Sequence, residues 1–262
     1  MKKVTILTFV LVCVTVASGY SQTEEGAYLN IDYLKVETEN LAKFEKLVKS
    51  EWVPILKKEA SNGDVTGSYF YKIVYPGGNL SKYNYVLVRT YQDLDAIMTE
   101  GQRLNELLSD GGKGVLSKSL ALAEFQFSEL WRTEAGVMNI MDAEPGAYAI
   151  VNFMRVKPGM ENQYLALEND IARPLHEERI RQDQMHNWRT YSLMKPGGIE
   201  YKYNFITADF YDIISNMEYG FSNEIMKSVM PRANFTETMN AIINTREIVN
   251  SELWKLLSYQ KK

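Results

Sequence analysis

The chain has 262 residues but only one cysteine, two histidines and seven prolines. It also lacks a basic excess: 29 Lys and Arg face 33 Asp and Glu, and this balance predicts that nucleic acid is not a partner. No apolar run reaches the roughly 20 residues of a transmembrane helix, so we expect no membrane span. No phosphate loop, dinucleotide fingerprint, nucleophile elbow or zinc signature occurs, and we predict no cofactor and no metal. What remains, 45% hydrophobic and 24% charged, is typical of a folded soluble protein.

The N-terminus has the three-part pattern of a secretory signal peptide. Lys2 and Lys3 precede an apolar run from Val4 to Val16, and small and polar residues follow as far as Gln22. We expect cleavage after Ser21, with cleavage after Gly19 as the alternative, and therefore an exported protein that is periplasmic or secreted. Removal of residues 1–21 also removes Cys13, which excludes disulfides and thiol chemistry from the mature chain.

The rest of the chain is an internal repeat. Three segments recur after 120 positions: Gly26–Tyr28 as Gly146–Tyr148, Pro76–Gly78 as Pro196–Gly198, and Lys82–Asn84 as Lys202–Asn204. A fourth, Ser128–Trp131, recurs 123 positions later as Ser251–Trp254. Four matches in the same order indicate a duplication. We predict a first repeat over residues 22–132, a linker over 133–145 and a second repeat over 146–262.

Each repeat has the pattern of a ferredoxin-like unit. In the first copy, alternation predicts a strand over Ala27–Val36, and apolar residues three or four apart predict a helix from Leu41 that Pro54 bends or ends. A hairpin around Pro76–Gly78, a helix over about 93–108 and a strand over about 122–131 complete the order βαββαβ. Both helices then cover one face of a four-stranded sheet. The predicted fold class is α+β.

The uncovered sheet face of each repeat needs a partner, and the other repeat supplies one. Two sheets facing each other form a barrel with a lumen. In this tandem pattern, and in the stretch Arg155–Glu161 with its Pro-Gly pair, the sequence resembles the dimeric α/β-barrel superfamily. That superfamily includes antibiotic-biosynthesis-type monooxygenases, NIPSNAP and EthD-like proteins, and the haem-binding chlorite dismutase group. The resemblance implies an intrachain barrel, in a monomer or a homodimer.

Strand alternation supplies candidate site residues. If Leu29, Ile31, Val86 and Val88 pack under the helices, the polar side chains between them face the lumen. These predicted ligand-binding residues are Asn30, Asp32, Tyr85, Arg89, Asn152, Thr207 and Asp209. Arg89 would hold an anionic group, and Asp32 or Asp209 would accept a proton. The alternative interpretation is a salt-bridged interior that binds nothing.

Three functions remain open at this point. The first is a small-molecule-binding protein that uses the lumen between the repeats. The second, implied by the resemblance, is a cofactor-independent monooxygenase or isomerase. The third, also implied by it, is a haem protein whose ligand would be His176 or His186, because neither histidine has a counterpart in the first repeat.

Overall fold

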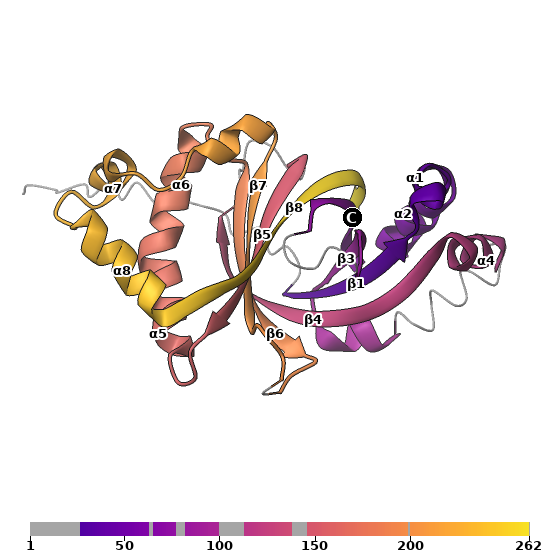
Figure 1. The fold of residues 1–262 in the computed structure, drawn as a ribbon, viewed down its shortest axis with the longest axis horizontal. Coiled ribbons are helices and arrows are strands. Elements are labelled where there is room, and N and C mark those ends of the chain that lie inside the picture. Colours follow the sequence, from indigo (N-terminus) through magenta and orange to yellow (C-terminus); the bar gives the residue numbers. More distant parts are fainter. Residues whose placement is uncertain are drawn as a thin grey trace, which may run out of the picture.

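The structure is a computed structural model that describes residues 27–62, 65–76, 82–99, 113–137, 146–198 and 200–261. The predicted signal peptide lies outside these residues, as do positions 77–81 of the predicted hairpin and 138–145 of the predicted linker. The eight strands described form one closed barrel in the order β1-β3-β2-β8-β5-β7-β6-β4. Figure 1 shows the barrel in the middle, with the helices of the first repeat on one side and those of the second on the other. Within the described ranges, no helix combines the length and apolar character needed to cross a membrane.

The first repeat supplies four antiparallel strands in the order β4-β1-β3-β2, which is the predicted ferredoxin-like arrangement. Its elements are β1 (Tyr28–Val36), α1 (Leu41–Leu47), η2 (Val48–Trp52), α2 (Val53–Asn62), β2 (Val65–Tyr75), β3 (Tyr85–Tyr91), α4 (Lys113–Leu122) and β4 (Ala123–Val137), with a short 3-10 turn η1 (Thr38–Asn40) before α1.

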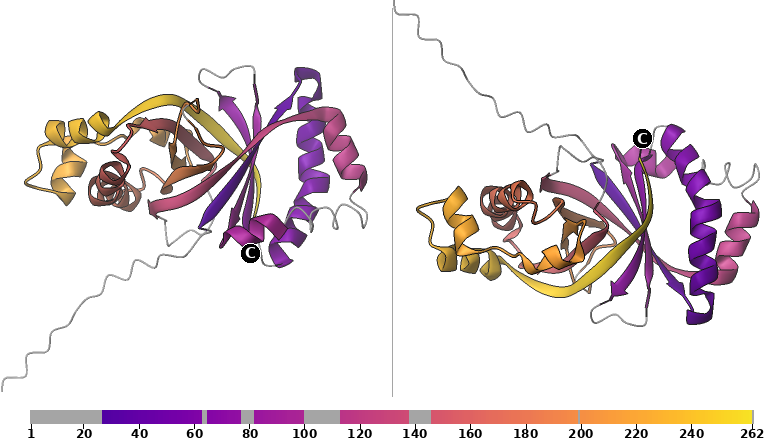
Figure 2. Two further views of the ribbon diagram at one scale, coloured as in Figure 1. Left: turned by 90° about the horizontal axis from the view of Figure 1, so that it is seen from below. Right: turned by 90° about the horizontal axis from the view of Figure 1, so that it is seen from above.

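The second repeat repeats this order as β8-β5-β7-β6. Its elements are β5 (Tyr148–Val156), α5 (Glu161–Leu167), η5 (Glu168–Ala172), α6 (Arg173–Arg181), β6 (Asn187–Lys195), β7 (Phe205–Tyr211), η6 (Ile214–Glu218), α7 (Asn223–Val229), α8 (Phe235–Thr245) and β8 (Arg246–Lys261). The long strands β4 and β8 close the barrel, because β4 also pairs with β6 and β8 also pairs with β2. Figure 2 shows both strands crossing from one repeat to the other.

The helix around Pro54 was predicted to bend or end, and the structure shows how it accommodates the proline. The helix does not end at Pro54; instead a π-helical turn, η2, precedes it and α2 continues beyond. The second repeat has the same π turn, η5, before Pro174. Proline lacks an N–H and its ring clashes with the carbonyl four residues earlier, so a wider turn relieves both problems. In the second repeat this π turn carries the buried Glu168.

Two elements differ from the sequence prediction. The helix predicted over 93–108 is present from residue 94 to 99, and its remainder lies outside the described residues. The helix α4 was not predicted. Strand β4 runs on to Val137, so residues 133–137 continue a strand instead of belonging to the linker. Ala135 and Val137 are buried against Trp188 of β6, which accounts for the extension.

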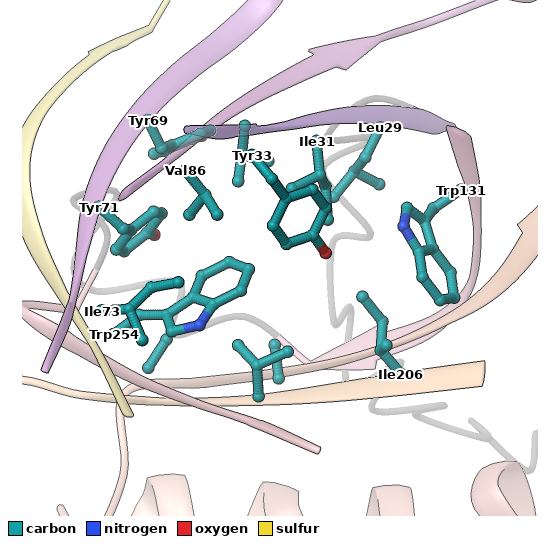
Figure 3. Close-up of a cluster of buried hydrophobic side chains, with 14 of the residues drawn as sticks. Leu29, Ile31, Tyr33, Tyr69, Tyr71, Ile73, Val86, Trp131, Ile206 and Trp254 are labelled. Atoms are coloured by element: carbon teal, nitrogen blue, oxygen red, sulfur yellow. The ribbon is translucent and has the colours of Figure 1, made fainter. Parts of the chain in front are cut away.

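The predicted strand faces are inverted. Leu29, Ile31, Val86 and Val88 do not pack under the helices; they line the barrel interior together with residues of the second repeat. Figure 3 shows this interior, where Tyr71, Trp131 and Trp254 point inward among aliphatic side chains. The opposite face, which carries Tyr85, packs against α1 through Phe44. Alternation separates two faces but does not say which face meets the helices, and the lumen is the drier place because sheet encloses it all round.

Two buried carboxyls join the repeats inside the barrel. Tyr83 of the first repeat donates a 2.7 Å hydrogen bond to Glu252 of the second, and Tyr203 of the second donates a 2.6 Å bond to Glu129 of the first. Each glutamate also accepts a bond from the Trp indole two residues later, at 3.1 Å for Glu129 and 2.7 Å for Glu252. These residues belong to the recurring Lys-Tyr-Asn and Ser-Glu-Leu-Trp segments. The repeated motifs therefore form reciprocal contacts between the two halves.

Candidate functional site

The second repeat contains a cavity between the outer face of its sheet and its helices. It measures about 310 Å³ and opens to solvent; we call it the second-repeat pocket. Apolar side chains such as Ile150, Phe221 and Ile242 line part of it. Its polar lining includes Asn152, Glu168, His176, Arg179, Thr207, Asp209, Tyr211 and Arg246.

Three of the seven predicted site residues lie in this pocket. Asn152 on β5 and Thr207 and Asp209 on β7 project from the outer face of the sheet toward α6 and η5, not into the lumen. The amide of Asn152 donates to the Thr207 hydroxyl at 3.4 Å and accepts a 2.7 Å bond from Ser251. The sequence prediction thus grouped these three residues correctly but placed them on the wrong side of the sheet.

Two carboxyls in the pocket, those of Glu168 and Asp209, have raised pKa values. Burial raises the pKa of Glu168 to about 7, and a hydrogen bond from Tyr164 and the charge of Arg246 only partly oppose this effect. Burial also raises the pKa of Asp209 to about 6, against the charge of Arg179 and a hydrogen bond from Tyr211. Near neutral pH each group therefore changes between acid and base, which is the requirement for general acid–base work.

His176 is neutral and its ring is fixed. It is buried, and burial together with the charge of Arg179 lowers its pKa well below the ordinary value. The ring stacks on Trp188 at 4.7 Å, and its Nδ1 lies 3.3 Å from Nη1 of Arg179 and 3.2 Å from the sulfur of Met185. A guanidinium can only donate, so Nδ1 accepts and the ring hydrogen resides on Nε2.

Two arginines supply positive charge to the same cavity. Arg179 on α6 is only 3% exposed; its Nη2 donates to the Tyr211 hydroxyl at 3.1 Å and to the Tyr219 carbonyl. Arg246 opens β8 and lies close enough to influence Glu168 and Asp209. The Nε–H of each arginine is buried and has no hydrogen-bond partner among the described residues. Leaving such a donor unsatisfied is costly, so an acceptor is expected there.

The histidines do not fit haem ligation. A haem ligand bonds iron through one ring nitrogen and donates from the other to a carboxylate or carbonyl. In His176 the Nδ1 faces a cation, which leaves the hydrogen on the nitrogen that would have to bind iron. His186 has a suitable carboxylate, Asp212 at 2.8 Å, but it is buried and lines none of the cavities found among the described residues. We therefore derive no function through haem.

The other four predicted residues lie on the outer face of the first repeat, across the barrel from the second-repeat pocket. Arg89 forms an ion pair with Asp32 at 2.6 Å and approaches Glu59 at 3.9 Å. Asn30 donates to Asp32 at 2.8 Å, and Tyr85 donates to Glu45 at 2.8 Å. Arg89 and Asp209 therefore line separate cavities, one in each repeat.

The lumen itself is nearly filled. Its cavity is about 80 Å³, well below the roughly 300 Å³ or more of ordinary ligand pockets. Aromatic side chains including Tyr69, Tyr71, Tyr191 and Trp254 line it. The sequence prediction of a ligand in the lumen stays a prediction, while the space available favours the second-repeat pocket.

Sequence patterns alone did not predict Glu168, Arg179 and Arg246 as site residues. A signal for them was present in the repeat. Glu168 and Arg246 occupy the places of Val48 and Ala123 in the first copy, so a charge in one copy replaces an apolar residue in the other. The same comparison singled out His176, whose counterpart is Leu56. Arg179 was harder to notice, because its counterpart, Glu59, is also charged.

Solved structures share this fold. A protein from Lactobacillus acidophilus NCFM, provisionally described as a monooxygenase, superposes with a TM-score of 0.57 at 6% identity over 90% of this chain and 97% of its own. Another protein with the same provisional description, from Fusobacterium nucleatum subsp. nucleatum, superposes with a TM-score of 0.56 at 10% identity. The match covers 90% of this chain and 94% of the other. An anthrone oxidase-like protein superposes with a TM-score of 0.50 at 9% identity, over 90% of this chain and 93% of its own.

At these identities the likeness concerns the fold. It confirms the predicted α+β fold, in which two ferredoxin-like repeats form one barrel. No family model matches the sequence, and no curated protein is detectably similar to it.

Proposed function

We propose that the protein binds a small anionic molecule in the second-repeat pocket. The observation that carries this proposal is the pair of arginines, Arg179 and Arg246, that line one cavity and whose buried Nε–H donors lack partners among the described residues. A carboxylate or phenolate oxygen in the pocket neutralises the guanidinium charge. The Nε2–H of His176 offers one more donor. Apolar walls beside these groups suit a ligand with a hydrophobic body and an anionic end.

A second candidate function is proton transfer on that ligand, in a cofactor-independent monooxygenase or isomerase. The raised pKa values of Glu168 and Asp209, about 7 and 6, favour it, because a carboxyl poised near neutrality can take a proton and return it. Arg179 or Arg246 would then stabilise the enolate or phenolate oxygen that remains. The provisional description of two structural neighbours as monooxygenases is consistent with this chemistry.

A charged and an uncharged probe of the same shape test the binding proposal. We expect salicylate to bind saturably and to raise the melting temperature, whereas salicylamide, which lacks the carboxylate, should bind at least about tenfold more weakly. The variant Arg246→Met should lower salicylate affinity by about tenfold or more, because it removes one guanidinium from the pocket. Titration calorimetry measures these affinities.

Arg155→Met is the matched control, since Arg155 lies on the neighbouring strand and is exposed. This control should bind salicylate as tightly as the wild type. Equal affinity of Arg246→Met and the wild type, or equal binding of salicylate and salicylamide, would contradict an anion site in this pocket. If salicylate binds but no exchange of an acidic proton is catalysed on any aromatic or enolisable probe, the binding proposal survives and the catalytic one fails.

We also propose that the protein is exported. The charged start, short apolar run and small residues before Gln22 support this proposal. Expressed with its full N-terminus in a bacterial host, the chain should accumulate outside the cytoplasm with Gln22 as its first residue, shown by fractionation and N-terminal sequencing. Replacing Leu7 and Val10 with aspartate should keep it in the cytoplasm at full length. A full-length chain in the exported fraction would contradict the predicted cleavage.

A further inference from the structure

The first repeat contains a cavity of its own at the place that corresponds to the second-repeat pocket. It measures about 180 Å³, and we call it the first-repeat pocket. Strand residues such as Leu34, Phe70 and Leu87 form its floor. Phe44 of α1 and Trp52 of η2 form one wall. Helix α4 contributes the opposite wall. Nine of the twelve lining residues are apolar, whereas nine of the sixteen residues around the second-repeat pocket, its two tyrosines included, are polar or charged.

Most polar groups of the first-repeat pocket are engaged with one another. Arg89 is paired with Asp32 at 2.6 Å, and Asp32 also accepts bonds from Asn30 and Ser128. On the helix side, the indole of Trp52 donates to Ser119 at 2.8 Å, and the Ser119 hydroxyl donates to a backbone carbonyl at 2.7 Å. A polar ligand would have to break these bonds, while an apolar ligand would leave them intact.

Equivalent positions show that the two copies have diverged in opposite directions. Ala123 and Arg246 both begin the last strand of their repeat, and they pair with Val36 and Val156 at corresponding places in the sheet. The methyl group of Ala123 therefore borders the first-repeat pocket where a guanidinium borders the second. On the floor, Leu87 takes the place of Thr207. One location in the fold thus has an apolar form and a charged form.

We propose that the first-repeat pocket is a second ligand site, which takes an uncharged apolar ring. Its volume exceeds the roughly 150 Å³ of an engineered apolar cavity that stays dry and binds benzene, so a substituted benzene fits and polar ligands gain little. Aromatic side chains line it on several sides, which favours ring contacts. Leu120 and Phe125, 65% and 53% exposed, form an apolar rim through which such a molecule enters. This site is independent of the anion site proposed above.

Toluene is the probe for this site, and benzoate is its charged counterpart. We expect the full chain to bind toluene saturably, and the variant Ala123→Leu to bind it about tenfold more weakly, because the added methyl groups occupy the cavity. The variant Leu87→Ala enlarges the floor and should bind naphthalene about tenfold more tightly than the wild type does. Titration calorimetry gives the affinities, and circular dichroism shows whether each variant is folded.

Ala172→Val is the control, because Ala172 lines the second-repeat pocket. It should leave toluene affinity unchanged. The proposal is overturned if toluene does not bind up to its solubility, if Ala123→Leu binds it as the wild type does, or if Ala172→Val abolishes binding, since toluene would then occupy the other pocket. Benzoate binding that Ala123→Leu abolishes would also overturn it, because the site would then be an anion site. If Ala123→Leu fails to fold, the naphthalene gain in Leu87→Ala decides the question.

Discussion

Replacing Arg89 with methionine should lower the free energy of unfolding by about 3 to 5 kcal/mol at neutral pH. The side chain is only 10% exposed, and it lies 2.6 Å from Asp32 and 3.9 Å from Glu59. Methionine fills similar space but leaves the half-buried Asp32 and the buried Glu59 without their cation. Removing one partner of a buried ion pair costs more than the pair contributes, because the remaining charge has lost both water and counterion.

The double variant Arg89→Met with Asp32→Asn should recover part of this loss, since one uncompensated carboxylate becomes a neutral amide. Lower pH should also recover part of it. Burial raises the pKa of Glu59, with Arg89 opposing the shift, so without the arginine this carboxyl takes up a proton even more readily. Urea denaturation of the single and double variants, at neutral and at mildly acidic pH, measures both effects.

Arg132→Met provides the matched control. Arg132 also forms a 2.6 Å ion pair, with Glu134, but its side chain is 52% exposed. Solvent screens such a pair, so this substitution should cost less than about 1 kcal/mol. Equal losses in Arg89→Met and Arg132→Met would mean that burial does not determine the cost and that our account of the Arg89 cluster is wrong.

The sequence contained enough information for the fold because the signal is redundant. Each element could be interpreted in two copies, and a register of 120 positions left little freedom in matching them. The helix α4 was missed although a counterpart exists. At the 123-position offset it corresponds to α8, and its Leu116 and Leu120 correspond to Met239 and Ile243.

The site was harder to predict, for a geometric reason. Alternation correctly placed Thr207 and Asp209 on the same face of the sheet and Asn152 beside them. However, an alternating pattern does not show which of the two faces the helices cover. Assigning the apolar face to the helices was reasonable for a single sheet with one side in water. In a closed barrel both faces are covered, and the lumen takes the side chains that are largest and most apolar. Only the arrangement of both repeats together supplies that information.

The protein should be more stable at pH 5 than at pH 8, and Glu252 should account for about 2.5 kcal/mol of the difference. Burial raises the pKa of Glu252 from 4.5 to about 7, and the nearby Glu129 adds to this, although Tyr83, Trp254 and Asn250 donate hydrogen bonds to it. A carboxyl with a raised pKa binds its proton more tightly in the folded state. Its contribution is therefore fully present below about pH 4.5 and is lost as the pH rises through about 7.

Other buried groups act within the same pH range. The pKa values of Glu129, Glu168 and Asp209 are also raised by burial, so these carboxyls change stability in the same direction as Glu252. His176 opposes them: its lowered pKa means that the unfolded chain takes up a proton first as the pH falls below 6.5, which lowers stability on the acidic side. With Glu59, whose pKa burial also raises, five carboxyls against one imidazole leave a net loss of stability as the pH rises.

The variant Glu252→Gln isolates one of these terms. Glutamine is neutral at every pH, so the difference in unfolding free energy between pH 5 and pH 8, measured by urea denaturation, should be about 2.5 kcal/mol smaller than in the wild type. An amide cannot accept every bond that the carboxyl accepts, and this loss applies at both pH values and cancels in the difference. Glu247→Gln, on the same strand but exposed, should keep the wild-type dependence. A Glu252→Gln profile parallel to the wild type would show that Glu252 is already ionised at pH 5 in the folded protein, with the barrel interior much wetter than its 1% exposure indicates.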